Sequence, residues 1–281
     1  TIAEICFQRG VKSAILSPGS RCAPLSLAFI RHPKISTRTI SDERSAGYIA
    51  LGMAQHNNQP TVLVCTSGTA SLNYTPAVSE AYYQQIPLIV FTADRPPEWI
   101  DQMDGQTIHQ RDMYGAHIKK SFELPVDLSH RDSKWFLERI ISEAVNTATT
   151  LPRGPVHINA PFREPLYDDA NSNMFKITDE VKIIDQVDGE LSLSENSWNK
   201  IIEELQNFKK ILIVAGQNRL DPSITSVLHS LSEKKAIPIV GDIITNLHGL
   251  PDIIRHGEMI LTQDEERLNA LQPDLLLTFG Q

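Results

Sequence analysis

The sequence predicts an α/β fold built around a mostly parallel sheet that is flanked by helices. Short runs of β-branched and apolar residues alternate with longer amphipathic runs through the first half of the chain, a pattern typical of strand–helix–strand units. Two short runs, TVLVCT at 61–66 and PLIVFTA at 87–93, are apolar on both faces, as strands are when helices cover both sides of a sheet. We therefore expect these two runs to be central strands.

The strands of the first domain, residues 1–167, are expected to end in polar or glycine-containing turns. In chain order they are SAILS (13–17), STRTIS (36–41), TVLVCT (61–66), PLIVFTA (87–93), SFELP (121–125) and PVHINAP (155–161). Helical stretches lie between most of them. The stretch at 43–54, ERSAGYIALGMA, combines small and apolar side chains, which favours a helix packed closely against a neighbour.

The pattern then changes twice. Residues 168–195 are polar and acidic without a sustained period, which indicates a linker between domains. Residues 196–281 start a second α/β unit with three predicted strands, KILIVAGQ (210–217), AIPIVGDII (236–244) and PDLLLTFGQ (273–281). Because sheets usually hold about 5–6 strands, we expect the sequence to stop inside this second domain.

Composition excludes several classes of protein. The 281 residues carry a formal charge of −8, which argues against nonspecific nucleic-acid binding. No apolar run is long enough to cross a bilayer, so we expect no membrane span, and the N-terminal TIAEICFQRG lacks the regions of a signal peptide. Cys6, Cys22 and Cys65 are isolated in the sequence, which favours reduced thiols and a cytoplasmic protein.

Polar clusters follow four of the predicted strands. In chain order they are SPGSR (17–21), SDER (41–44), TSGTA (66–70) and TADRPPE (92–98). Ligands of open α/β sheets bind at the carboxyl ends of the strands, near helix N-termini. We therefore expect the four clusters to converge on one edge of the sheet.

Each cluster also has a plain structural explanation. Asp42 and Glu43 fit first-turn acids that the helix dipole stabilises. Three hydroxyl residues have the composition of helix N-caps; they are Ser20, Ser67 and Thr69.

The same holds for the remaining polar residues. Gly68 fits a tight turn that needs a positive φ, and Arg95 is close enough in sequence to pair with Glu98 on the surface. His109 and His117 lack partners at metal-ligand spacing. The chain also has no G-x-x-x-x-G-K-[ST] and no G-x-G-x-x-G motif, so the common nucleotide-binding interpretations of such folds are weak.

Taken together, the motifs resemble the N-terminal half of the SEPHCHC synthase family, thiamine-diphosphate-dependent enzymes of menaquinone biosynthesis. The resemblance rests on SPGSR, SDERSAGYIALGMA, TSGTA, TADRPPE, GQTIHQ and NAPFREPLY, in this order. The E-R-x-A-x-x-x-A-x-G-x-A pattern and the T-S-G-T turn are shared by thiamine-diphosphate enzymes more widely, including acetolactate synthases. SPGSR and TADRPPE point to this family. The resemblance is specific through about Tyr167 and looser from there to Gln281.

The resemblance implies a thiamine-diphosphate-binding fold. Residues 1–167 then form its pyrimidine-binding domain, 168–195 the linker, and 196–281 the first part of a truncated Rossmann-like central domain, with the C-terminal diphosphate-binding domain absent. In that family one glutamate hydrogen-bonds N1′ of the cofactor's aminopyrimidine, and the motif places this role on Glu43. A protonated carboxyl shared with N1′ favours the imino tautomer, whose nitrogen removes the C2 proton of the thiazolium.

The resemblance also implies the substrates. The family decarboxylates 2-oxoglutarate and adds the resulting succinyl carbanion equivalent to isochorismate. Both substrates are dianions, and guanidinium groups bind carboxylates through paired hydrogen bonds. The implied isochorismate-side residues are Ser20, Arg21, Arg95 and Gln106, and the residues that shape the pyrimidine pocket beside Glu43 are Gly68 and Thr69.

Partners and metal follow from the same resemblance. A homodimer or a dimer of dimers is expected, in which the small side chains of 43–54 pack against a helix of the partner. Magnesium or manganese is expected to hold the diphosphate through the absent C-terminal domain. GDIITN at 241–246 lacks the second glycine and the length of the family's metal motif, so we interpret it as a strand end and expect no metal ligand in this chain. The 281 residues alone are expected to be inactive.

Two other functions remain open from the sequence. A different thiamine-diphosphate enzyme, such as an acetolactate synthase, shares the wider motifs but uses substrates with one carboxylate. A noncatalytic α/β binding module shares only the sheet. The clustered Arg21 and Arg95 favour the synthase over the first alternative, and a requirement for Glu43 distinguishes it from the second.

Overall fold

The computed structural model describes residues 1–167, 180–187, 189, 192–219 and 221–280. The chain divides into two compact units, Thr1–Gly189 and Glu190–Gln281. Each unit is an α/β layer structure with its own hydrophobic core, as the alternating sequence pattern predicts. Among the residues described, no helix has both the length and the apolar character that crossing a bilayer requires.

A six-stranded sheet with the order β2-β1-β3-β4-β6-β5 forms the centre of the first unit. Every strand pairing in it is parallel. The strands are β1 (Ser13–Leu16), β2 (Ser36–Thr39), β3 (Thr61–Cys65), β4 (Leu88–Asp94), β5 (Lys120–Glu123) and β6 (Val156–Pro161). β3 and β4 lie in the middle and are buried at every position, so the prediction that they are central strands is confirmed.

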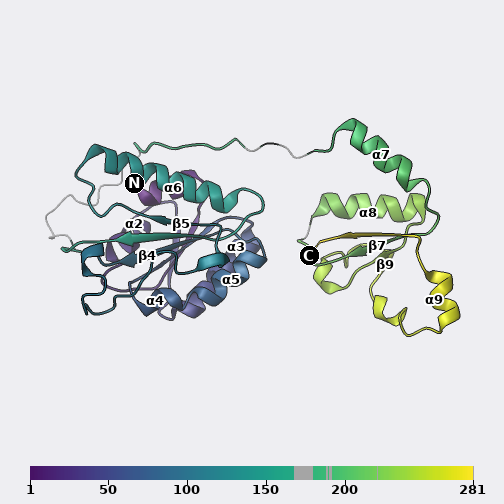
Figure 1. Ribbon diagram of the computed structural model, residues 1–281, viewed down its shortest axis with the longest axis horizontal. Coiled ribbons are helices and arrows are strands. Elements are labelled where there is room, and N and C mark those ends of the chain that lie inside the picture. Colours follow the sequence, from purple (N-terminus) through teal and green to yellow (C-terminus); the bar gives the residue numbers. More distant parts are fainter. Residues whose placement is uncertain (168–179, 188, 190–191, 220, 281) are drawn as a thin grey trace. The chain divides into compact units, whose positions relative to one another are not determined.

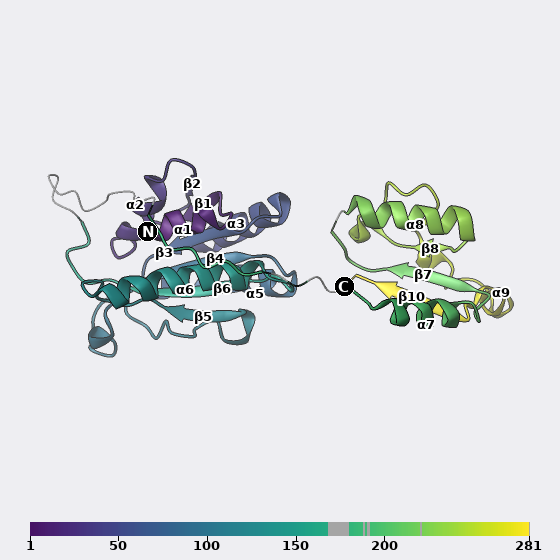
Figure 2. The same ribbon diagram turned by 90° about the horizontal axis from the view of Figure 1, so that it is seen from above.

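Helices cover both faces of this sheet (Figures 1 and 2). The helices are α1 (Ile2–Gln8), α2 (Ala23–Ile30), α3 (Glu43–Asn57), α4 (Thr69–Leu72), α5 (Thr75–Tyr83) and α6 (Arg131–Thr149), with short 3-10 helices η1 (Pro97–Trp99) and η2 (Gly115–His117). Side chains of α1, α2 and α6 build one core with the sheet. Side chains of α3 and α5 build a second core on the opposite face.

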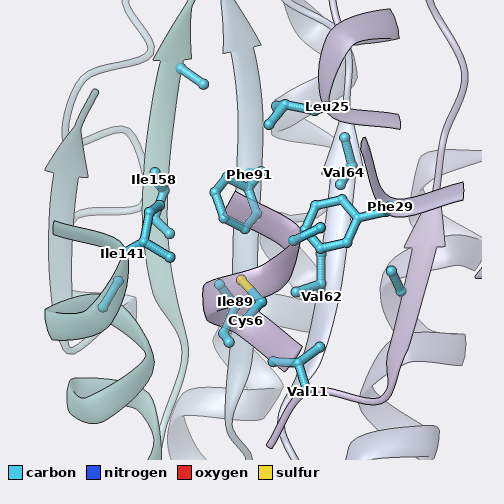
Figure 3. Close-up of a cluster of buried hydrophobic side chains, with 14 of the residues drawn as sticks. Cys6, Val11, Leu25, Phe29, Val62, Val64, Ile89, Phe91, Ile141 and Ile158 are labelled. Atoms are coloured by element: carbon cyan, nitrogen blue, oxygen red, sulfur yellow. The ribbon is translucent and has the colours of Figure 1, made fainter. Parts of the chain in front are cut away.

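The first core is filled by interlocking apolar side chains from helices and strands (Figure 3). Phe29 of α2 and Phe91 of β4 are both fully buried, and their ring centroids lie 5.9 Å apart. Cys6 of α1 lies in the same core, where burial raises the pKa of its thiol to about 12. This cysteine is therefore a small apolar side chain in function, not a reactive thiol.

α3 packs through its small residues against helix α5 of the same chain. Ala46, Ala50 and Ala54 are fully buried. A Cβ added at Gly47 would stand 2.9 Å from the Cβ of Ala77 on α5, so the absence of a side chain at Gly47 allows the close approach. The expectation that the small side chains face a dimer partner is thus wrong for these alanines, because the chain's own helix already covers them.

Part of the predicted linker, 168–195, packs against the first unit. Residues 168–179, 188 and 190–191 of it lie outside the described residues. Val181 and Ile183 lie on the first core. The Ile184 carbonyl accepts a hydrogen bond of 3.0 Å from the Asn146 side chain on α6. This segment is therefore an extended strap on α6 rather than a free spacer.

The second unit holds a four-stranded parallel sheet with the order β10-β7-β8-β9. Its elements are α7 (Glu195–Leu205), β7 (Ile211–Ala215), α8 (Pro222–Lys235), β8 (Ile239–Val240), η3 (Ile243–Thr245), β9 (Ile253–Ile254), η4 (Gly257–Met259), α9 (Glu265–Leu271) and β10 (Leu275–Phe279). The sequence predicted three of these strands and missed β9, which has only two residues. GDIITN follows β8 directly, as expected of a strand end.

Candidate active site

The loops after β1 and β3 lie against each other at the carboxyl edge of the first sheet. A Cβ at Gly19 would come within 2.4 Å of the Thr66 side chain, so this position tolerates only hydrogen there. Since all six strands are parallel, the loops after β1, β2, β3 and β4 share this edge. The structure thus brings the four polar clusters to one side of the sheet.

Glu43 is the first residue of α3 and is half-buried. The cap of this helix is its neighbour Asp42, whose Oδ1 accepts a 2.7 Å hydrogen bond from the Ser45 backbone N–H. Among the described residues, the Glu43 carboxylate accepts only one long hydrogen bond, of 3.5 Å, from the side-chain amide of Asn73. Capping therefore accounts for Asp42 but leaves the Glu43 carboxylate available to a ligand.

Three titratable groups that feel the charge of Glu43 stay protonated. Burial raises the pKa of the Cys22 and Cys65 thiols, and the charge of Glu43 raises both further. Burial also raises the pKa of the Tyr74 hydroxyl well above its ordinary value. That hydroxyl contacts the Ser17 hydroxyl at 3.1 Å and donates to the Val64 carbonyl at 2.9 Å. The two thiols and the Tyr74 hydroxyl near Glu43 therefore carry no charge.

The turn after β3 is shaped by Gly68, the N-cap of α4, which has a φ of 83°. A Cβ there would lie 3.0 Å from the backbone oxygen of Gln106. The Gly68 backbone N–H donates a 2.7 Å hydrogen bond to the buried side chain of Gln110. The positive φ expected from the sequence is present. In addition, the backbone of Gln106 leaves no room for a Cβ at Gly68.

Arg95 joins this turn to the loop after β4. Its Nη1 donates to the Ser67 hydroxyl at 2.6 Å, its Nε to Asp104 at 2.9 Å, and its Nη2 to the Gly105 carbonyl at 2.7 Å. Glu98 pairs instead with Arg163, so the predicted surface pair of Arg95 and Glu98 is wrong.

The hydroxyl residues are not helix caps either. Cys22 and Gly68 occupy the N-cap positions of α2 and α4, and neither helix has a side-chain cap. Ser67 is buried under Arg95, whereas Ser20 and Thr69 are exposed at the loop surface. The N-cap explanation therefore fails for all three residues.

Arg21 lies near enough to Asp104, the partner of Arg95, to affect its carboxylate. It is 8% exposed and donates to the Phe162 carbonyl at 2.9 Å and to Glu164 at 3.2 Å. The hydrogen bond from Arg95 lowers the pKa of Asp104, and the charge of Arg21 lowers it further. Both guanidinium groups thus act on one carboxylate. The Nε of Arg21 is buried without a partner among the described residues, an orphaned donor of the kind that ligand binding satisfies.

A buried polar network below this edge was missed by sequence reasoning. Its members are Thr92, Asp94, Gln110, His157 and Asn159, all of them less than a tenth exposed. Burial raises the pKa of Asp94, even though Asn159 and the Arg95 backbone N–H donate to its carboxylate. Four of the members lie in the quoted motifs TADRPPE, GQTIHQ and NAPFREPLY, but nothing in the sequence indicates that they are buried together.

The predicted residues divide into two groups. Arg21, Arg95 and Gly68 are held by defined contacts, and Glu43 stands half-buried beside them. Ser20, Thr69 and Gln106 are exposed, and Gln106 has a φ of 57°. No cluster of three or more potential metal-ligating side chains occurs in the described ranges.

This donor set fits the aminopyrimidine end of thiamine diphosphate. The Glu43 carboxylate has one long hydrogen bond, the thiols and the tyrosine hydroxyl near it are uncharged, and Gly68 has no side chain. A diphosphate needs cationic or metal anchors, and the two arginines near the turn are tied to Asp104, Glu164 and backbone carbonyls.

Comparison with known proteins relates this chain to enzymes that use the same cofactor. Residues 1–115 match the family model described as thiamine pyrophosphate enzyme, N-terminal TPP binding domain. Thiamine pyrophosphate is another name for thiamine diphosphate. Over 280 residues, 99% of the chain, the sequence is 45% identical to a 2-succinyl-5-enolpyruvyl-6-hydroxy-3-cyclohexene-1-carboxylate synthase of Cytophaga hutchinsonii and covers 49% of it. It is 39% identical to the synthase of the same name from Flavobacterium johnsoniae, again over 49% of that protein.

The chain therefore spans about half the length of the curated relatives it matches. A solved structure is also similar, that of a Rhodococcus jostii RHA1 thiamine diphosphate-dependent 4-hydroxybenzoylformate decarboxylase. The two align with a TM-score of 0.71 over 100% of this chain and 52% of that one, at 18% identity. At this identity the likeness shows the fold, and the predicted thiamine-diphosphate-binding α/β fold is confirmed.

Proposed function

We propose that this chain acts as the N-terminal part of a SEPHCHC synthase, a thiamine-diphosphate-dependent transferase of menaquinone biosynthesis. Residues 1–115 match the thiamine pyrophosphate enzyme model, and the chain is similar along its length to synthases of that name. The observation that carries the proposal is the arrangement at one sheet edge. A half-buried glutamate is the first residue of α3. In the loops at the same edge, two arginines both lower the pKa of Asp104.

Glu43 has the role of a proton-holding group. When bound, thiamine diphosphate supplies the carbanion chemistry that decarboxylates 2-oxoglutarate and transfers the succinyl group to isochorismate. Glu43 holds a proton against N1′ of the aminopyrimidine, while the protonated Tyr74 and the thiols of Cys22 and Cys65 add no competing charge. The turn at Gly68 and Thr69 borders the ring.

Arg21 and Arg95 bind the dianionic isochorismate. Their guanidinium groups attract carboxylates, and the exposed Ser20 and Gln106 offer further hydrogen bonds at the same edge. Since Asp104 already accepts from Arg95, an incoming carboxylate shares the guanidinium with Asp104 or displaces it. This pair of arginines favours the synthase over an acetolactate synthase, whose substrates carry one carboxylate.

The partner and the metal complete the proposal. Apolar and aromatic side chains remain exposed on α3, α4 and α5; they are Tyr48, Ile49, Leu72, Tyr82 and Tyr83. Such a surface suits contact with a second copy, which supports a homodimer or a dimer of dimers. We place this assembly in the cytoplasm, as expected from the isolated cysteines. Magnesium or manganese and the diphosphate are assigned to the half of the relatives that this chain does not cover.

Exchange of the cofactor's C2 proton tests the role of Glu43. In the complete enzyme, Glu43→Gln should slow hydrogen–deuterium exchange at C2 of bound thiamine diphosphate by roughly 10² to 10⁴-fold, the usual contribution of general acid–base catalysis. The neutral amide cannot supply the proton that N1′ requires. Glu80→Gln, an exposed glutamate on α5, is the matched control and should exchange like the parent. Equal exchange in Glu43→Gln and the parent would remove Glu43 from the mechanism.

Substrate kinetics test the arginines separately. Arg21→Ala or Arg95→Ala should each weaken isochorismate binding by about 1.5–3 kcal/mol, the worth of a hydrogen bond to a charged group. The loss should appear as a higher KM for isochorismate. Decarboxylation of 2-oxoglutarate should suffer less, because the two arginines are proposed to bind isochorismate. Steady-state rates with each substrate varied in turn give both values, and equal losses for the two substrates would contradict the assignment.

A further inference from the structure

Two loops that the proposed function assigns to different ligands lie backbone against backbone. The turn at 66–70 borders the cofactor, and the loop at 104–107 carries Gln106 on the isochorismate side. The Cα, carbonyl carbon and oxygen of Gln106 all lie within 3.0–3.1 Å of where a Cβ on Gly68 would stand. Any shift of one loop therefore changes the position available to the other.

Gln110 fastens these two loops together from below. Its side chain is 1% exposed and makes three hydrogen bonds. Oε1 accepts from the Gly68 backbone N–H at 2.7 Å. Nε2 donates to the Ala93 carbonyl and to Asn159 Oδ1, each at 3.0 Å. Gln110 belongs to the same chain segment as Gln106, so it ties the acceptor-side loop both to the turn and to strands β4 and β6.

Asn159 fixes which way the Gln110 amide points. Its Nδ2 donates to Asp94 Oδ2 at 2.9 Å, which leaves Oδ1 as the acceptor for Gln110. The Thr92 hydroxyl donates to the same Oδ1 at 3.0 Å. With the Asn159 amide oriented in this way, Gln110 presents its nitrogen to Asn159 and its oxygen to Gly68. We call Gln110 and its three hydrogen bonds the latch. Its orientation is determined by buried groups on β4 and β6.

We propose that Gln110 is a positioning residue that couples the cofactor-side turn at Gly68 to the acceptor-side loop at Gln106, with Asn159 setting its orientation. The inference rests on the proposed function for what the loops bind, while the latch is a property of the chain itself. A buried glutamine that only fills space would need no partner on the turn, whereas Gln110 accepts a hydrogen bond from the Gly68 backbone N–H.

Hydrogen exchange of this 281-residue chain measures the latch without any ligand. Gln110→Met keeps the length and approximate volume of the side chain but removes all three hydrogen bonds. The Gly68 amide should then exchange about tenfold faster, the loss expected for one buried hydrogen bond. Amides of β3 should keep their parental rates. Gln102→Met, an exposed glutamine in the same loop region, should change neither.

Two outcomes of the exchange experiment overturn the proposal. An unchanged rate at Gly68 means that the Gln110 contact does not hold the turn. Equal acceleration at Gly68 and along β3 means that the substitution weakens the whole unit and that Gln110 is merely structural.

Kinetics of the complete enzyme test the coupling to the substrate side. Gln110→Met should raise KM for isochorismate about tenfold. In a Gln106→Ala background it should raise it less than about twofold, because the loop then has no Gln106 side chain left to position. Additive effects of the two substitutions overturn the coupling. If the parent enzyme forms no product from 2-oxoglutarate and isochorismate, the proposed function fails, and the exchange result still decides the latch.

Discussion

The two sheets of the chain have similar sequences but very different burial. In the first unit β3, β4 and β6 are buried at every position, because helices cover both faces. In the second unit β10 leaves Leu276 53% and Leu277 36% exposed, although LLLTF is as apolar as the buried strands. An apolar strand sequence therefore does not by itself predict that the strand is buried. Burial depends on the helices that pack on the sheet.

The difference also separates the region that carries the site from the region that does not. Glu43, Gly68 and Arg95 follow strands β2, β3 and β4 of the well-covered sheet. The buried Gln110 ties Gly68 to Asn159 on β6. In the described part of the second unit, helix α7 has no buried residue, and the core is small. A site that needs atoms held in place is expected in the first unit.

Paired core substitutions give the largest expected difference between the units. Phe91→Ala should lower the free energy of unfolding of the first unit by about 3–5 kcal/mol, since it removes a fully buried aromatic ring and leaves a cavity. Leu276→Ala should change the second unit by less than about 0.5 kcal/mol, because the side chain is half-exposed. Hydrogen exchange at increasing urea concentrations gives the free energy of unfolding of each unit separately and so measures both effects. A loss at Leu276 as large as that at Phe91 would show that the sheet is covered in solution.

Acid should weaken the two units unequally. Burial lowers the pKa of His157 from 6.5 to about 4, so between these values the unfolded state binds more protons than the folded state. The stability of the first unit is then full above about pH 6.5 and falls as the pH drops toward 4, by about 3 kcal/mol in total. The histidines of the second unit are not buried; they are His229, His248 and His256.

His157→Gln provides the control for the acid experiment. Glutamine can bond to the Thr92 hydroxyl that contacts His157 at 2.7 Å, but it does not titrate. The variant should therefore lose most of the pH dependence between 6.5 and 4 when unfolding free energies are measured across that range. A parental slope in this variant would assign the titration to another group.

The smallest expected effect concerns the exposed helix α7. Ser194 caps it by accepting a 3.2 Å hydrogen bond from the Ser197 backbone N–H. Since no residue of α7 is buried, the helix depends on such local contacts. Ser194→Ala should destabilise it by about 1 kcal/mol, visible as faster amide exchange over 195–200 while α3 is unaffected. Ser194→Asp, which keeps a capping oxygen, should restore the slow exchange.

The sequence alone determined the class of fold, the central position of β3 and β4, and the four polar clusters at one edge. These features follow from local patterns. Strand length and two-faced apolar character are properties of a few consecutive residues, and parallel strands place the loops after them on the same side. The motif order also pointed to the enzymes that the comparisons then found to be similar.

Only the tertiary structure decided the contacts that join distant parts of the chain. The pairing of β4 with β6, with β5 displaced to the edge, brings Asn159 next to Thr92 and within reach of Gln110. The same fold pairs the Arg95 guanidinium with Asp104 rather than with Glu98. No local period encodes such contacts, because each depends on which strands pair and in what register, and that choice is made by the burial of the whole sheet at once.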